Sequence, residues 1–218
     1  MAMIAEPVTA LTDLLLALLG TWIGWRLRQS TLPVHWSRRL WAWGIVLQST
    51  GALLGGSYHA FLPILTQGQS ELLWQLTLLF LGAATSFLIA GIGFGVFPQK
   101  LARLCFILMG LKFLIYALFA VMVKCFLPAL CDQGVSLLLV AALLFYGRKE
   151  IPVVAREIAI ALVLTVIGGV IQYFHLGLHR NFNHNDIYHI FSAFAFWFFY
   201  RGGRLLTDVP QKEKMELR

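Results

Sequence analysis

Residues 72–97 read LLWQLTLLFLGAATSFLIAGIGFGVF, an apolar stretch without a charged side chain. A helix needs about 20 mostly apolar residues to cross the hydrocarbon core of a bilayer, so this stretch predicts a membrane-spanning helix. The whole chain has the same character, because 59% of its 218 residues are hydrophobic and 12% are charged. Ordinary soluble domains carry about 25% charged residues. The composition therefore excludes a soluble enzyme, a disordered chain and a nucleic-acid-binding domain.

Further apolar runs on either side of this stretch predict additional spans. The seven candidates are Val8–Leu27, Leu40–Leu62, Leu72–Phe97, Leu101–Leu127, Ala129–Tyr146, Val153–Phe174 and Asn185–Tyr200. The fifth is the weakest, because Asp132, Gln133 and Gly134 interrupt its start. We expect an all-α, polytopic membrane protein, with a seven-transmembrane helix bundle over residues 1–204 and a polar cytoplasmic tail over residues 205–218.

The basic residues predict the orientation. Most of the 17 Lys and Arg residues fall in alternate loops and after the last span, and the net charge of +7 reflects this bias. Cytoplasmic loops of membrane proteins are enriched in Lys and Arg. We therefore predict an N-terminus outside, a C-terminus in the cytoplasm, and a multi-pass protein of a bacterial inner membrane. Trp41 and the aromatic run from Phe194 to Tyr200 are typical of an interfacial belt or a lipid-facing surface.

Every histidine except His35 lies toward the predicted outer end. These residues are His59, His175, His179, His184 and His189. Acidic side chains lie at similar depth, namely Asp13, Glu71 and Asp186. Imidazole is a common zinc ligand, and catalytic zinc needs three protein ligands and an open position for water. The shared depth therefore predicts a Zn²⁺ site.

We expect His59 and His189 to be ligands, with His184 or Asp186 as the third. Asp186 or Glu71 would orient a zinc-bound water or act as the base, and Ser57 or Tyr58 would donate to an oxyanion. His184 and His189 are about 140° apart on an ideal helix. Both could ligate only if His184 lay in the turn before the helix. The same polar stretch is also typical of a simple helix cap, with Asn183 and Asn185 as good N-cap residues.

These residues resemble a superfamily of seven-span metal hydrolases that includes alkaline ceramidases and progestin/adiponectin-type receptors. His59 matches a histidine of its second span, Glu71 resembles its acidic position, and His189 matches one histidine of its seventh span. The chain departs from the pattern at Gly55 and Asn185, where the superfamily has a serine and a histidine. The stretch Phe182–His189 also resembles an uncharacterised bacterial membrane family. The resemblance implies a zinc-dependent hydrolase of a lipid amide or ester, with membrane lipid as both environment and substrate.

Two other functions fit the same pattern. Two of the outer histidines could be axial ligands of haem in a redox protein. Alternatively, a non-enzymatic receptor or carrier could bind a ligand or proton at the outer end, with Lys112 marking a path through the bundle. Gln48 and Glu157 are candidate partners of Lys112. The pairs Gly51/Gly55 and Gly91/Gly95 have a spacing that lets membrane helices approach closely.

Overall fold

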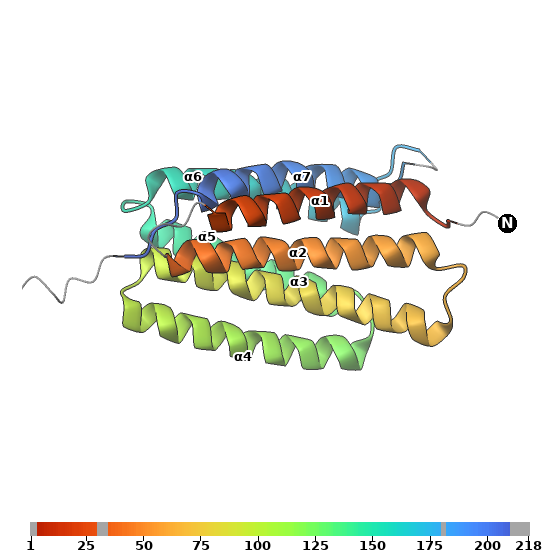
Figure 1. Ribbon diagram of the computed structural model, residues 1–218, viewed down its shortest axis with the longest axis horizontal. Coiled ribbons are helices and arrows are strands. Elements are labelled where there is room, and N and C mark those ends of the chain that lie inside the picture. Colours follow the sequence, from red (N-terminus) through yellow and green to blue (C-terminus); the bar gives the residue numbers. More distant parts are fainter. Residues whose placement is uncertain (1–3, 30–34, 180–181, 210–218) are drawn as a thin grey trace, which may run out of the picture.

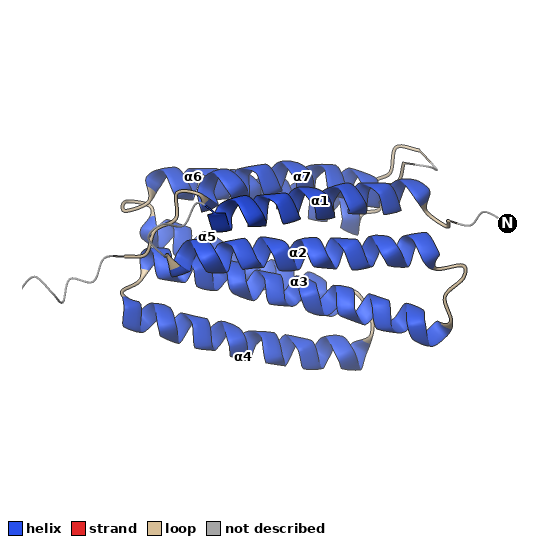
Figure 2. Cartoon of the chain, in the orientation of Figure 1, coloured by secondary structure: helices blue, strands red, loops and turns tan. Residues whose placement is uncertain are grey.

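The protein is built from α-helices. The computed structural model describes residues 4–29, 35–179 and 182–209, and within these ranges it contains seven helices and no strand (Figure 2). The helices are α1 (Pro7–Gln29), α2 (Trp36–Phe61), α3 (Gln67–Val96), α4 (Gln99–Val123), α5 (Leu127–Gly147), α6 (Pro152–Tyr173) and α7 (His184–Gly203). Each predicted span corresponds to one helix, so the all-α prediction is confirmed.

The helices lie side by side along the long axis of the molecule (Figure 1). Six of them form a closed ring, in which α1 packs on α2, α2 on α3, α3 on α5, α5 on α6, α6 on α7, and α7 on α1. In the described residues α4 contacts α3 and α5 alone, and its buried side chains are Ala102, Tyr116 and Ala120. Closure of the ring between α7 and α1 brings the first and last helices of the chain side by side.

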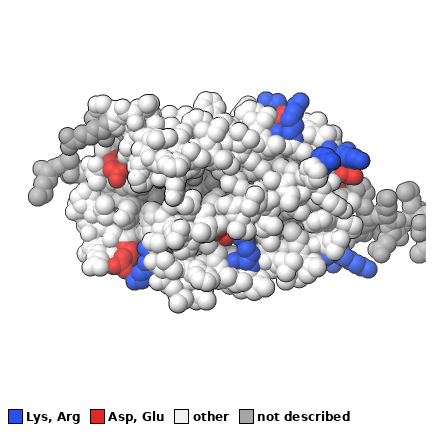
Figure 3. Space-filling model, turned by 180° about the vertical axis from the view of Figure 1, so that it is seen from behind, with Lys and Arg blue, Asp and Glu red and all other residues white. Residues whose placement is uncertain are grey.

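Five of these helices are long and apolar enough to cross a membrane, namely α1, α3, α4, α5 and α6. Helices α2 and α7 are less apolar, because polar and charged side chains and small residues interrupt their apolar runs. Large apolar side chains face outward, as Leu138 and Met122 do with more than two thirds of their surface exposed. On the face drawn in Figure 3, most Lys and Arg side chains lie toward the end opposite the start of α1. The chain thus has the helices of a multi-pass membrane protein.

Glycines hold α2 and α3 in close contact. A Cβ atom on Gly91 would lie 2.9 Å from the carbonyl oxygen of Ser37 and 3.0 Å from the backbone nitrogen of Trp41. A Cβ on Gly44 would lie 3.1 Å from the carbonyl oxygen of Ala84. Only a residue without a side chain lets the two backbones approach this closely. The close approach predicted at Gly91 is therefore confirmed.

Trp41 is a core residue, which corrects its prediction as part of an interfacial belt. Its side chain is fully buried, and the indole Nε1–H donates to the carbonyl oxygen of Phe199 at 3.0 Å. The Trp41 and Phe199 rings meet edge to face, with centroids 5.4 Å apart. Phe199 is also buried rather than lipid-facing. Because indole has a polar N–H, it tolerates this burial only with an acceptor nearby.

The segment after α7 folds back onto the start of α2. The carboxylate of Asp208 accepts hydrogen bonds from the backbone N–H groups of Trp36 and Ser37, at 2.9 and 2.8 Å. Leu206 is fully buried, and the N–H of Val209 donates to the carbonyl oxygen of Phe94. Residues 205–209 therefore pack on the bundle, in contrast to the polar tail predicted there. The remainder of the predicted tail, residues 210–218, lies outside the described residues.

Candidate functional site

The start of α7 is fixed by a reciprocal cap. The side-chain oxygen of Asn183 accepts from the N–H of Asn185 at 2.7 Å, and Asp186 Oδ2 accepts from the N–H of Asn183 at 2.7 Å. Such pairs satisfy backbone donors that have no partner inside the helix. The prediction of Asn183 as the N-cap is confirmed. Because His184 is already helical, it and His189 point in different directions.

His189 lies between two residues of α1. Its Nε2 atom is 3.2 Å from Asp13 Oδ1, and its Nδ1 atom is 2.8 Å from the Thr12 hydroxyl oxygen. The same hydroxyl lies 3.4 Å from Asp186 Oδ1. In the tautomer with hydrogen on Nε2, His189 donates to Asp13 and accepts from Thr12. Because the Thr12 hydroxyl has a single hydrogen, it donates either to His189 or to Asp186 at one time. Asp13, His189, Thr12 and Asp186 therefore form one series of polar contacts.

A second set of contacts connects this series to side chains that lie nearer the surface. Asn183 Nδ2 donates to Glu6 Oε2 and to the Thr9 hydroxyl, each at 3.4 Å. Glu6 Oε1 lies 3.3 Å from His59 Nδ1, and these two side chains are 38% and 20% exposed. Asp186 is completely buried and Asp13 is 4% exposed, so exposure rises from the inner to the outer members. We call Glu6, Thr9, Thr12, Asp13, His59, Asn183, Asp186 and His189 the outer cluster.

Helix α1 supplies three of these eight residues, and Glu6 lies directly before it. Asp13 was noted in the sequence for its depth, but no residue of this helix was assigned a role. Glu6, Thr9 and Asp13 follow the spacing i, i+3 and i+7, which places them on one face of a helix. Thr12 lies beside them and completes the contact with His189. This polar stripe in an otherwise apolar run was the signal in the sequence that could have identified α1 as part of the site. It shows that α1 presents its polar face to α7.

Several predicted site residues lie apart from the outer cluster. Glu71 is exposed, and its carboxylate accepts from Gln67 Nε2 at 3.0 Å and from Lys124 Nζ at 3.2 Å. The Ser57 hydroxyl donates to the carbonyl oxygen of Leu53 on its own helix at 2.8 Å. The His184 ring packs against the ring of His175, beyond the end of α6, with centroids 4.5 Å apart.

The predicted zinc ligands do not share a centre. A zinc ion requires donor atoms about 2.0–2.2 Å away around a single point. In the structure, His59 pairs with Glu6, His184 with His175, and His189 with Asp13 and Thr12. Across the described part of the chain, no group of three or more His, Cys, Asp or Glu residues is arranged to hold a metal ion. This arrangement does not fit zinc, and the zinc assignment stays a prediction.

Lys112 has a different partner from those predicted. Its ammonium group lies 2.7 and 2.9 Å from the two oxygens of Asp132 on α5, and 2.8 Å from the Thr85 hydroxyl on α3. Thr85 also donates to Asp132 at 2.9 Å. Glu157, which was one of the two predicted partners of Lys112, pairs with Arg156 and Arg201 instead. The polar start of the fifth span therefore contains the counter-ion of Lys112.

Comparison with known families gives one match, which covers residues 8–208. The chain belongs to the DUF6962 family. DUF6962 is a family of unknown function, so membership in it assigns no activity to the outer cluster. No curated protein and no solved structure matches this DUF6962 chain.

Proposed function

We propose that this chain is a multi-pass membrane protein that exchanges protons through its outer cluster, as a proton-coupled carrier does. The observation that carries the proposal is the buried series Asp13–His189–Thr12–Asp186. Ionisable side chains inside membrane helices are costly, and they characteristically mark proton relays or substrate paths. Here two acids and an imidazole are buried together between α1 and α7.

The chemistry of the cluster suits proton exchange. A buried carboxylate is stable only when it is paired or protonated, and both Asp13 and Asp186 are buried. His189 contacts Asp13 directly and Asp186 through Thr12. The more exposed pair of His59 and Glu6 connects this core to solvent through Asn183.

We further propose that α2 and α7 also cross the membrane, with the N-terminus outside and the C-terminus in the cytoplasm of a bacterial cell. With 26 and 20 residues, they would be about 39 and 30 Å long. The hydrocarbon core of a bilayer is about 30 Å thick. Both helices belong to the ring, and on the face drawn in Figure 3 most Lys and Arg side chains lie toward the end opposite the start of α1.

Proton flux into reconstituted vesicles tests the proposed function. Purified protein would be placed in vesicles that enclose a pH-sensitive dye, and a potassium diffusion potential would drive proton entry. We expect Asp13→Asn and His189→Gln to abolish the flux. Glu71→Gln is the matched control, because it removes an exposed carboxylate that binds Lys124 outside the cluster. Wild-type vesicles no faster than empty ones, or full flux in both cluster variants, would refute the proposal.

A lipid amide or ester hydrolase is the second candidate. The order Thr12–His189–Asp13 favours it, because an imidazole between a hydroxyl and a carboxylate is the arrangement that activates a nucleophile or a water. The test is incubation of the purified protein with lipid amides and esters, with and without added Zn²⁺. Product that is lost in Thr12→Val and His189→Gln would favour this candidate. No turnover under either condition would exclude it.

The same purified sample tests the zinc prediction and the haem prediction separately. Metal analysis that finds about one zinc per chain, lost in His59→Ala, would restore the zinc site. A Soret band after haem supplementation would favour the redox alternative. A sample with neither signal would leave proton exchange through the protein's own side chains as the simplest account of the outer cluster.

A further inference from the structure

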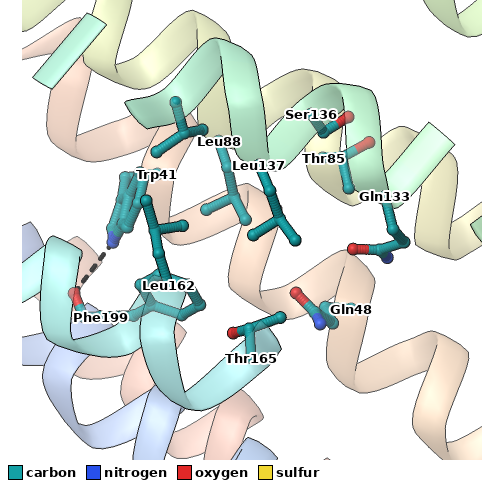
Figure 4. Close-up of a pocket in the computed structure, with 11 residues that line it drawn as sticks. Trp41, Gln48, Thr85, Leu88, Gln133, Ser136, Leu137, Leu162, Thr165 and Phe199 are labelled. Carbon is teal, nitrogen blue, oxygen red and sulfur yellow. Dashed lines mark hydrogen bonds between the residues drawn. The ribbon is translucent and has the colours of Figure 1, made fainter. Parts of the chain in front are cut away.

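A small cavity lies in the middle of the bundle, away from the outer cluster. Its volume is about 40 Å³, and residues of α2, α3, α5, α6 and α7 line it. Figure 4 shows polar side chains gathered toward one end of the cavity and the buried rings of Trp41 and Phe199 at the other. The polar lining residues are Gln48, Thr85, Gln133, Ser136 and Thr165. One end of the cavity is therefore polar although it lies within a membrane bundle.

One lining group lacks a hydrogen-bond partner. Ser136 is 4% exposed, and its hydroxyl oxygen is buried without a partner in the structure. Leaving a buried hydroxyl unpaired costs about 1–3 kcal/mol, whereas a water molecule in the cavity would satisfy it. A water needs roughly 10–15 Å³ and two to four polar partners. The cavity therefore has room for about three water molecules and enough polar groups to hold them.

The cavity touches the ion pair of Lys112 and Asp132. Thr85 lines the cavity and also bonds both members of that pair. Besides Thr85 from α3, the side chain of Tyr116 from α4 lies near the pair. The Tyr116 hydroxyl donates to the carbonyl oxygen of Leu78. Asp132 is therefore the carboxylate within reach of the cavity through a single hydroxyl.

We propose that the central cavity binds a small cluster of water molecules that hydrates the Lys112–Asp132 pair through Thr85, and that this pair is a second proton-exchange site. The inference rests on the proposed function for its proton role, but not for the water itself. A proton that arrives along the waters binds the Thr85 hydroxyl oxygen while that hydroxyl passes its own hydrogen to the Asp132 carboxylate. The reverse exchange at Thr85 returns the proton to the waters. The ammonium group of Lys112 remains the counter-charge.

Hydroxyl-radical labelling in lipid nanodiscs detects the water. Radicals made from bound water by a short X-ray pulse oxidise side chains beside that water. Trp41 is the reporter, because it lines the cavity but is fully buried from bulk solvent. We expect oxidation of Trp41 in the wild type and its loss in Ser136→Val, which fills the cavity. Ser86→Val is the matched control, because Ser86 is a buried serine that bonds Gly82 and does not line the cavity.

A second variant shows whether a loss of labelling comes from the loss of water or from misfolding. Thr165→Val removes a hydroxyl from the opposite wall at nearly unchanged volume, and we expect it to lower Trp41 oxidation without loss of folded protein. An unlabelled Trp41 in the wild type, or equal labelling in Ser136→Val, would overturn the water site. Proton flux measured on Ser136→Val should also fall, and unchanged flux with lost labelling would overturn the proton role. Labelling without any wild-type flux would refute the proposed function and keep the water site.

Discussion

Removing the charge of Lys112 should destabilise the protein strongly. The side chains of Lys112 and Asp132 are only 16% and 6% exposed, and the ammonium group contacts both carboxylate oxygens and the Thr85 hydroxyl. In Lys112→Met the carboxylate would keep a single hydrogen bond, from Thr85. Breaking a buried pair by removing one partner costs about 3–5 kcal/mol, because the other charge is left uncompensated. We expect a loss of that size in the free energy of unfolding.

The double variant shows whether this cost comes from the ion pair. Replacing both members of a buried pair by apolar residues is often neutral or stabilising, so Lys112→Met with Asp132→Leu should recover most of the loss. The assay is reversible unfolding in mixed micelles with increasing SDS, followed by circular dichroism. A loss below about 1 kcal/mol for Lys112→Met, or a double variant less stable than either single variant, would refute the reasoning.

Three further substitutions test the packing of the bundle. Gly91→Ala should cost about 1–3 kcal/mol, because its Cβ would lie 2.9 Å from the carbonyl oxygen of Ser37; a melting temperature equal to that of the wild type would contradict this. Asp208→Ala should cost about 0.5–2 kcal/mol through the lost cap of α2, and faster amide exchange at the start of that helix is the measurement. Trp41→Phe should lower stability by at least about 0.5–1.5 kcal/mol, because it removes the hydrogen bond to the carbonyl oxygen of Phe199; unchanged unfolding would show that the bond contributes nothing.

The helices could be predicted from the sequence because the signal for each is a long apolar run. The structure places a helix at every such run, including the weak fifth one. That run was weak because of Asp132, and the reason is now clear: Asp132 faces Lys112. A polar residue in an apolar run shows that a partner exists, but the sequence does not tell which neighbouring helix supplies it. Gln48 and Glu157 were therefore plausible partners and proved to be wrong.

The sequence predicted how deep the site residues lie along the spans, but not the directions in which their side chains point. His59, Asp186 and His189 do lie in one cluster at one end of the bundle, as their positions along the spans suggested. Their contacts depend on how each helix is rotated, and α1 proved to supply the partners of His189. The direction of a side chain depends on packing between distant segments, which a single sequence does not reveal. The zinc ligands and the resemblance to metal hydrolases stay predictions for the same reason.

The return of the chain end to the start of α2 has a consequence for biosynthesis. Asp208 provides acceptors for backbone amides at Trp36 and Ser37, yet a ribosome makes these amides long before it reaches that aspartate. At synthesis rates of about 5–20 residues per second, the amides wait many seconds for their acceptor. Throughout that interval these two amides lack the acceptor that the folded structure gives them. A residue near the end of the chain therefore completes the start of a helix that is synthesised early.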